Sequence, residues 1–108
     1  MIIITSFTAD QINNCFLKNG WDIEKPLDEI DDEYICEDLA QFSKESIVVD
    51  FGFYGDVTAP NEGKFGIYII DNNDWENYMA NFRFRDFNLA LSVMRFLSSA
   101  QHVTRIST

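Results

Sequence analysis

The sequence offers few residues able to perform acid–base or nucleophilic chemistry. Its single histidine, His102, lies in a polar tail, and its two cysteines, Cys15 and Cys36, occupy apolar patterns. Catalysis by a cysteine or serine needs a nucleophile held against a base, and the sequence contains no GxSxG motif. We therefore expect a solvated His102, two reduced core cysteines and no enzymatic activity.

A glycine-containing stretch from Gly55 to Lys64 superficially resembles a phosphate-binding loop. Seven residues separate Gly55 from Gly63, whereas a Walker A motif has about four between its glycines. Phe65 also stands where that motif needs a hydroxyl side chain. We interpret these glycines as turn formers and expect no cofactor.

Acidic residues give the strongest compositional signal. The chain has 18 acidic and 8 basic residues, for a net charge of −10. Residues 22–38 alone hold nine acids and one lysine. Such a field repels nucleic-acid phosphates and anionic membranes and attracts basic proteins. We expect a protein partner with a basic surface, and neither direct nucleic-acid binding nor membrane binding.

The acidic run from Asp28 to Glu33 does not have the pattern of a calcium loop. An EF-hand needs oxygen ligands at alternating positions and a glycine at the sixth, and this run has neither. Metal binding is therefore disfavoured.

The first predicted element is a helix over 9–19. Thr8 and Gln11 have the spacing of a capping box. Apolar residues follow at helical spacing, and Gly20 suits the position just after a helix end.

A second, amphipathic helix is predicted over 27–43. Pro26 stands at its start. Apolar residues recur at helical spacing, and acids fill the remaining circumference: Leu27, Ile30, Tyr34, Ile35, Leu39 and Phe42 on one side, and Asp28, Asp31, Asp32, Glu33, Glu37 and Asp38 on the other. An all-acidic outer face is self-repelling, which favours a role in binding a cationic partner over mere solubility.

The remaining pattern changes to the period of strands. Alternation predicts strands at 47–54, 65–70 and 78–85, followed by a helix from about Asp86 or Asn88. The sequence therefore predicts an α+β fold with two N-terminal helices, a three-stranded antiparallel meander and a C-terminal helix packed on one sheet face. Met1–Thr5 is a candidate edge strand.

We expect a single domain over 1–108 with a flexible tail at 101–108. No apolar run reaches the roughly 20 residues needed to cross a bilayer, and the opening residues lack the features of a signal peptide. A cytoplasmic protein is the expectation.

One face of the predicted sheet is a second candidate surface. If Ile47 and Val49 face the core, then Asp50 and Tyr54 face outward. Outward neighbours would include Tyr68, Ile70, Arg83 and Arg85. Tyrosine and arginine are frequent in binding hot spots, but a simple cross-strand pair of Asp50 with Arg83 or Arg85 explains them equally well. Trp75 is expected to be a lid on the core.

Two segments carry a family resemblance. Ile47–Asp56 and Phe65–Glu76, in a small chain with an acidic first half, resemble bacterial immunity proteins of contact-dependent growth inhibition and other polymorphic toxin systems. The resemblance covers about the last two-thirds of the chain and rests on general character. It implies a cytosolic antitoxin that binds a toxin domain, often a nuclease, and blocks its active site or an exosite.

On this reading the chain is an immunity protein that neutralises a cognate basic toxin. We expect no catalytic residues and no metal ligands. The expected partner-binding residues are Asp28, Glu29, Asp31, Asp32, Glu33, Tyr34, Glu37, Asp38, Tyr54 and Asp56. The alternative is a phage- or plasmid-encoded nucleic-acid mimic that inhibits a restriction or CRISPR effector. Mimicry predicts acids along a whole face, whereas residues 63–108 carry four acids and five bases. A small enzyme with an unrecognised site is the third possibility.

Overall fold

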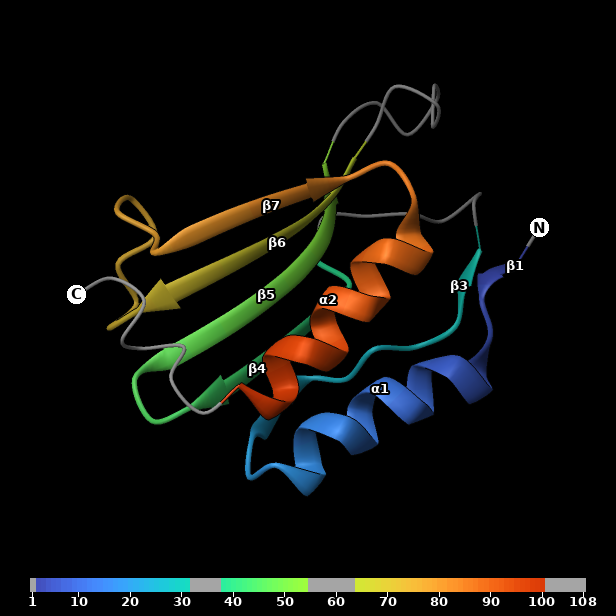
Figure 1. Ribbon diagram of the computed structural model, residues 1–108, viewed down its shortest axis with the longest axis horizontal. Helices are drawn as coiled ribbons and strands as arrows, with labels where there is room; N and C mark the ends of the chain where they lie inside the picture. The colour runs from blue at the N-terminus through green and yellow to red at the C-terminus, as the bar shows by residue number, and fades with distance from the viewer. Residues whose placement is uncertain (1, 32–37, 55–63, 101–108) are drawn as a thin grey trace.

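The computed structural model describes residues 2–31, 38–54 and 64–100. In chain order these residues form β1 (Ile2–Ile4), α1 (Ser6–Lys18), β2 (Asp22–Lys25), β3 (Ile30–Asp31), β4 (Ala40–Lys44), β5 (Ile47–Tyr54), β6 (Lys64–Asp71), β7 (Ala80–Phe84) and α2 (Phe87–Ser99). Five strands make an antiparallel sheet in the order β2-β4-β5-β6-β7, and β1 pairs with β3 separately. Both helices lie over the same face of the large sheet (Figure 1).

The predicted architecture is therefore wrong. The described residues form an α+β fold with one helix before the sheet, and the sheet has five strands in place of a three-stranded meander. Strands β3 and β4 stand inside the segment 27–43 that the apolar spacing predicted as a second helix, and residues 32–37 lie outside the described residues. The predicted edge strand at Met1–Thr5 corresponds to β1, which pairs with β3 and not with the large sheet.

Strand β4 shows why the helical reading failed. Ala40 and Phe42 are buried, whereas Gln41 and Ser43 are half-buried, which is the period of a strand. Phe42 pairs with Val49 of β5 and with Ile23 of β2. The spacing of three between Leu39 and Phe42 fits a helix equally well, so the sequence pattern alone did not distinguish the two.

The turn between β4 and β5 also lacked a sequence signal. Glu45 follows β4 with a φ of 56°, and Ser46 completes the connection to Ile47. Short hairpin turns of this kind usually contain Asn or Gly, because a positive φ is strained for other residues. No glycine marks this turn, so the sequence pattern does not predict a hairpin at this point.

Helix α1 begins three residues earlier and ends one residue earlier than the predicted 9–19, and Gly20 follows its C-cap Asn19 as expected. Its N-cap is Thr5, whose hydroxyl accepts the backbone N–H of Thr8 at 3.2 Å, so the assignment of the cap to Thr8 is wrong. At the other end, Gly20 has a φ of +86° and donates to the carbonyl of Leu17 at 3.1 Å. Trp21 donates to the carbonyl of Phe16 at 3.0 Å, which completes a Schellman motif.

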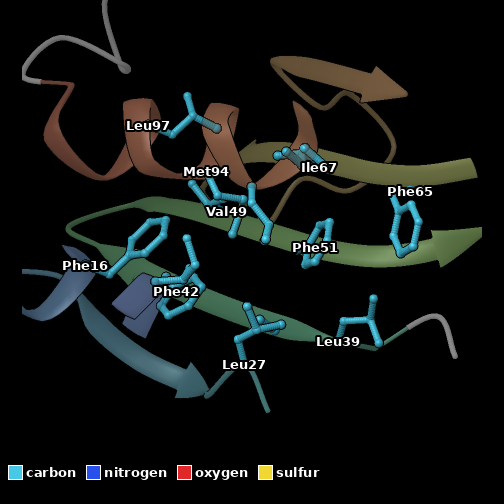
Figure 2. Packing of buried hydrophobic residues seen from close by; sticks show 14 of the residues in the cluster. Phe16, Leu27, Leu39, Phe42, Val49, Phe51, Phe65, Ile67, Met94 and Leu97 are labelled. Carbon is cyan, nitrogen blue, oxygen red and sulfur yellow. The ribbon is translucent and has the colours of Figure 1, made fainter. Parts of the chain in front are cut away.

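The core lies between the two helices and the sheet. Phe16 of α1 stacks on Phe42 with 3.8 Å between ring centroids, and both side chains are fully buried. Figure 2 shows Val49 and Met94 packed beside them. The indole Nε1 of Trp21 donates to the carbonyl of Ser98 at 2.9 Å, which ties the end of α2 to the segment after α1.

Replacing Phe42 by alanine tests the position of β4 in the core. We expect Phe42→Ala to lower the free energy of unfolding by about 3–5 kcal/mol, because it leaves a cavity beside Phe16. Phe96→Ala is the matched control, since Phe96 is 69% exposed and should change stability by about 0.5 kcal/mol or less. Urea denaturation measures both, and equal losses in the two variants would contradict this core.

Candidate functional site

The face of the sheet away from the helices carries a continuous row of polar residues. Strand pairing places Gln41 opposite Asp50, Asp50 opposite Tyr68, and Tyr68 opposite Asn81. Lys25 of β2 is paired with Gln41 and extends the row to the sheet edge. We call Lys25, Gln41, Asp50, Tyr68 and Asn81 the polar row; it crosses all five strands of the large sheet.

Asp50 is the most unusual member of the polar row, because it is only 5% exposed. Its carboxylate accepts hydrogen bonds from Tyr54 Oη at 3.2 Å and from Gln41 Nε2 at 3.3 Å. Burial raises the pKa of Asp50 above its ordinary value; the two hydrogen bonds oppose the rise, Asp38 adds to it and Lys25 opposes it. A buried carboxylate held by neutral donors is costly, so its retention calls for an explanation.

Arg83 lies among tyrosines and not against Asp50. Its guanidinium carbon is 4.6 Å from the ring centroid of Tyr54 and 5.4 Å from that of Tyr68, and it donates to Tyr68 Oη at 2.6 Å. Tyr68 also meets the rings of Tyr54 and Tyr78 edge to face, at 5.5 and 5.1 Å. These four residues form the tyrosine–arginine cluster. The expected cross-strand pair of Asp50 with Arg83 is therefore not formed. Asp50 instead accepts from Tyr54 and Gln41, and Arg83 contacts tyrosines.

Gly66 makes room for this cluster. A Cβ added at Gly66 would lie 2.7 Å from the ring of Tyr54, so the tyrosine rests directly on the glycine backbone. Tyr54 reaches across β6 in this way to the guanidinium of Arg83 on β7. Burial, followed by the nearby Asp50 carboxylate, raises the pKa of Tyr54, which keeps its hydroxyl protonated as a donor.

Asn81 ends the polar row with an unused acceptor. Its Oδ1 is buried and has no hydrogen-bond partner among the residues that the structure describes. A buried acceptor without a partner costs free energy, and an ordered water or a donor from another molecule would relieve that cost. The backbone pairing sets it beside Tyr68 of the tyrosine–arginine cluster.

Four of the predicted partner-binding acids lie around one depression of about 560 Å³. Asp28, Glu29, Asp31 and Asp38 line it together with Lys25. We call it the acidic depression. Three of these carboxylates are exposed and Asp31 is half-buried. The convergence comes from the segment between β2 and β3, from β3 itself and from the residues just before β4, and not from a helix surface.

The acidic depression adjoins a smaller cavity of about 230 Å³, which contains Asp50. Lys25, Asp38, Ala40, Gln41 and Asp50 line this cavity, so the two hollows share Lys25 and Asp38. On the other side of Asp50 stands Tyr54, which is itself one of the predicted contact residues. The surface is therefore continuous from the acidic depression, through the polar row, to the tyrosine–arginine cluster.

The other predicted residues have varied outcomes. Asp32, Glu33, Tyr34, Glu37 and Asp56 lie outside the described residues, as do Cys36, His102 and the predicted flexible tail at 101–108. Cys15 is free but half-buried, and is not a core residue as predicted. Trp75 is 46% exposed, so its prediction as a core lid is wrong.

Sequence reasoning missed the roles of Gln41, Lys25 and Asn81. Recognising the alternation of Ala40, Gln41, Phe42 and Ser43 as a strand would have placed Gln41 outward beside Asp50. The bulge between Ile23 and Lys25 shifts the pairing of β2, and no sequence signal announces it.

In the parts of the chain that the structure covers, no group of three or more histidine, cysteine or acidic side chains is placed to hold a metal ion. Neither of the two described helices is long and apolar enough to cross a membrane. No protein-family model matches the chain, and no curated protein or solved structure matches it either. Functional inference therefore starts from the geometry of the surface itself.

Replacing Asp50 by asparagine tests the effect of its burial on stability. Because the folded-state pKa of Asp50 is raised, the folded state binds more protons than the unfolded state between the ordinary value of 3.8 and the raised pKa. The contribution of Asp50 to stability should fall as pH rises through that window, and stay low above it.

The measurement is urea denaturation of the wild type and Asp50→Asn from about pH 4 to pH 7. The stability of the wild type relative to Asp50→Asn should decrease as pH rises, and a constant or increasing difference would contradict the burial effect. Asp10→Asn, which removes an exposed carboxylate of α1, corrects for the change in net charge.

Proposed function

We propose that this protein is an immunity-type protein of the bacterial cytoplasm that binds and neutralises a cognate toxin domain with a basic surface. It acts by occupying that surface, not by catalysis. The observation that supports this most strongly is the continuous surface formed by the acidic depression, the polar row and the tyrosine–arginine cluster, on the sheet face that neither described helix covers.

The tyrosine–arginine cluster has the chemistry of a binding hot spot. Tyrosine and arginine are the residue types most enriched at such sites. Here the rings and the guanidinium already hold one another through stacking and a hydrogen bond at 2.6 Å. Pre-ordered side chains lose less conformational entropy on binding, which favours tight association.

Charge supports a basic partner in particular. The chain carries a net charge of −10, and exposed Asp28 and Glu29 rim the acidic depression beside the polar row. Such a field speeds encounter with a cationic protein and discriminates against anionic ones. Toxins that act on nucleic acids have basic surfaces for their substrates, and the acidic depression would complement one.

The toxin reading is tested with the protein encoded next to this chain in its native genome. Expression of that protein's toxic domain alone should stop growth, and co-expression of this chain should restore it. The two should copurify at equal stoichiometry, more stably at low salt than at high salt, because exposed charge pairs are screened. Copurification with a restriction or CRISPR effector and no growth protection would favour the mimic and overturn the immunity reading.

Arginine substitutions test which face binds. Arg83→Ala should weaken binding to the toxin by tenfold or more, since removal of a hot-spot side chain costs about 2 kcal/mol or more. Arg95→Ala removes an equally charged, exposed side chain from α2 on the other side of the sheet and should leave affinity within about twofold. Calorimetric titration measures both, and equal effects would contradict docking through the sheet face.

A further inference from the structure

The cavity beside Asp50 is large enough to hold one whole side chain. At about 230 Å³ it is smaller than the roughly 300–1,000 Å³ of typical small-molecule sites. Four of its five lining residues are polar or charged, and the surface that they and Ala40 present is part polar and part apolar. A cavity of this size and mixed chemistry suits one long side chain, with an apolar stem and a charged end, that enters from a partner's surface.

Asp50 has hydrogen-bonding capacity that the fold leaves unused. A carboxylate offers about four acceptor positions, and two are taken by Tyr54 and Gln41 at 3.2 and 3.3 Å. Both bonds are slightly longer than usual, since about 2.7–3.2 Å is typical of an N–H donor and about 2.5–3.0 Å of a hydroxyl donor. Both donors are also neutral, so among the described residues no hydrogen bond to Asp50 brings the positive charge that a buried carboxylate favours.

The cavity lining carries charges of both signs. Two carboxylates, Asp38 and Asp50, face one ammonium, that of Lys25. The Lys25 Nζ donates to the backbone carbonyl of Asp38, which holds it at that side of the cavity.

We propose that this cavity is a socket for one arginine side chain of the partner, with Asp50 as its counter-ion. A guanidinium presents several N–H donors in a plane, so it can reach the Asp50 carboxylate and a second acceptor together. Gln41 supplies that acceptor, because its Nε2 donates to Asp50 and its amide oxygen accepts from other donors. A lysine ammonium lacks this planar fork.

The socket adds to the proposed function and rests on it. It assigns one recognition element of a basic toxin surface, an arginine that projects far enough to enter the sheet face. The Tyr54 hydroxyl contacts Asp50 directly, so the socket borders the tyrosine–arginine cluster. The arginine would therefore be inserted close to the expected hot spot.

The test uses L-argininamide as the probe and the full chain labelled with nitrogen-15. Titration should give saturable chemical-shift changes at the backbone amides of Gln41, Asp50 and Tyr54, with a dissociation constant in the millimolar range. L-citrullinamide is the matched probe, since it has nearly the same shape without the charge. It should give no saturable change at these amides.

Asp50→Asn should weaken argininamide binding by at least about tenfold, because it removes the counter-ion. Asp10→Asn is the matched control variant, as it removes an exposed carboxylate from α1 on the other side of the sheet, and it should change affinity by less than about twofold. The amide spectrum of each variant shows directly whether it is folded. If Asp50→Asn does not fold, the comparison of the two probes on the wild type decides the question.

Shifts spread over the acidic surface, equal binding of citrullinamide, or unchanged affinity in folded Asp50→Asn would each overturn the socket. None of these measurements uses a toxin. Failure here together with growth protection would remove the socket and leave the proposed function standing. Saturable argininamide binding without any growth protection would support the socket and remove the proposed function.

Discussion

The register between β4 and β5 is the constraint on which the rest of the surface depends. Phe42 pairs with Val49 and stacks on Phe16, so it must point toward the helices. Successive residues of a strand point to opposite faces, so burial of Phe42 turns Gln41 outward, directly beside Asp50. A slip of one residue would expose Phe42 and bury Gln41, which the helix-covered core does not tolerate. Core packing on one face thus fixes the polar row on the other.

Asp50 makes the outward face more than a solvated sheet surface. An outward carboxylate would normally be hydrated, yet Asp50 is 5% exposed and its burial raises its pKa. Tyr54 contributes to that site twice, through its hydroxyl on Asp50 and through its ring on Gly66 and Arg83. A glycine at position 66 is needed for this geometry, because any side chain would meet the Tyr54 ring. An aromatic ring packed over a strand glycine also stabilises the sheet without any role in binding. That benefit does not explain a buried carboxylate with neutral partners.

The sequence predicted strongly patterned elements well and the acidic segment badly. Strand β5 covers 47–54 as predicted, β6 extends the predicted 65–70 by one residue at each end, and α2 begins after the N-cap Asp86. Alternation over eight residues is a clear signal, and Gly20 gave a clear stop for α1. Between 27 and 43 the apolar residues fit two periods, and a turn at Glu45 without glycine concealed the hairpin. Outward placement of Tyr54 followed from period 2 alone, whereas its contact with Gly66 depends on tertiary packing.

The acidic residues are arranged differently from the predicted helix, but their charge can still act on a partner. Carboxylates along one helix would form a rigid stripe, but here Asp28, Glu29, Asp31 and Asp38 meet around a depression next to the polar row. Exposed charges mainly raise the rate of encounter, and they are screened by salt. Buried groups such as Asp50, and hot-spot contacts such as those of the tyrosine–arginine cluster, mainly determine how slowly a complex dissociates. Under the proposed function, the acidic depression would therefore orient a basic partner, and the neighbouring sheet face would hold it.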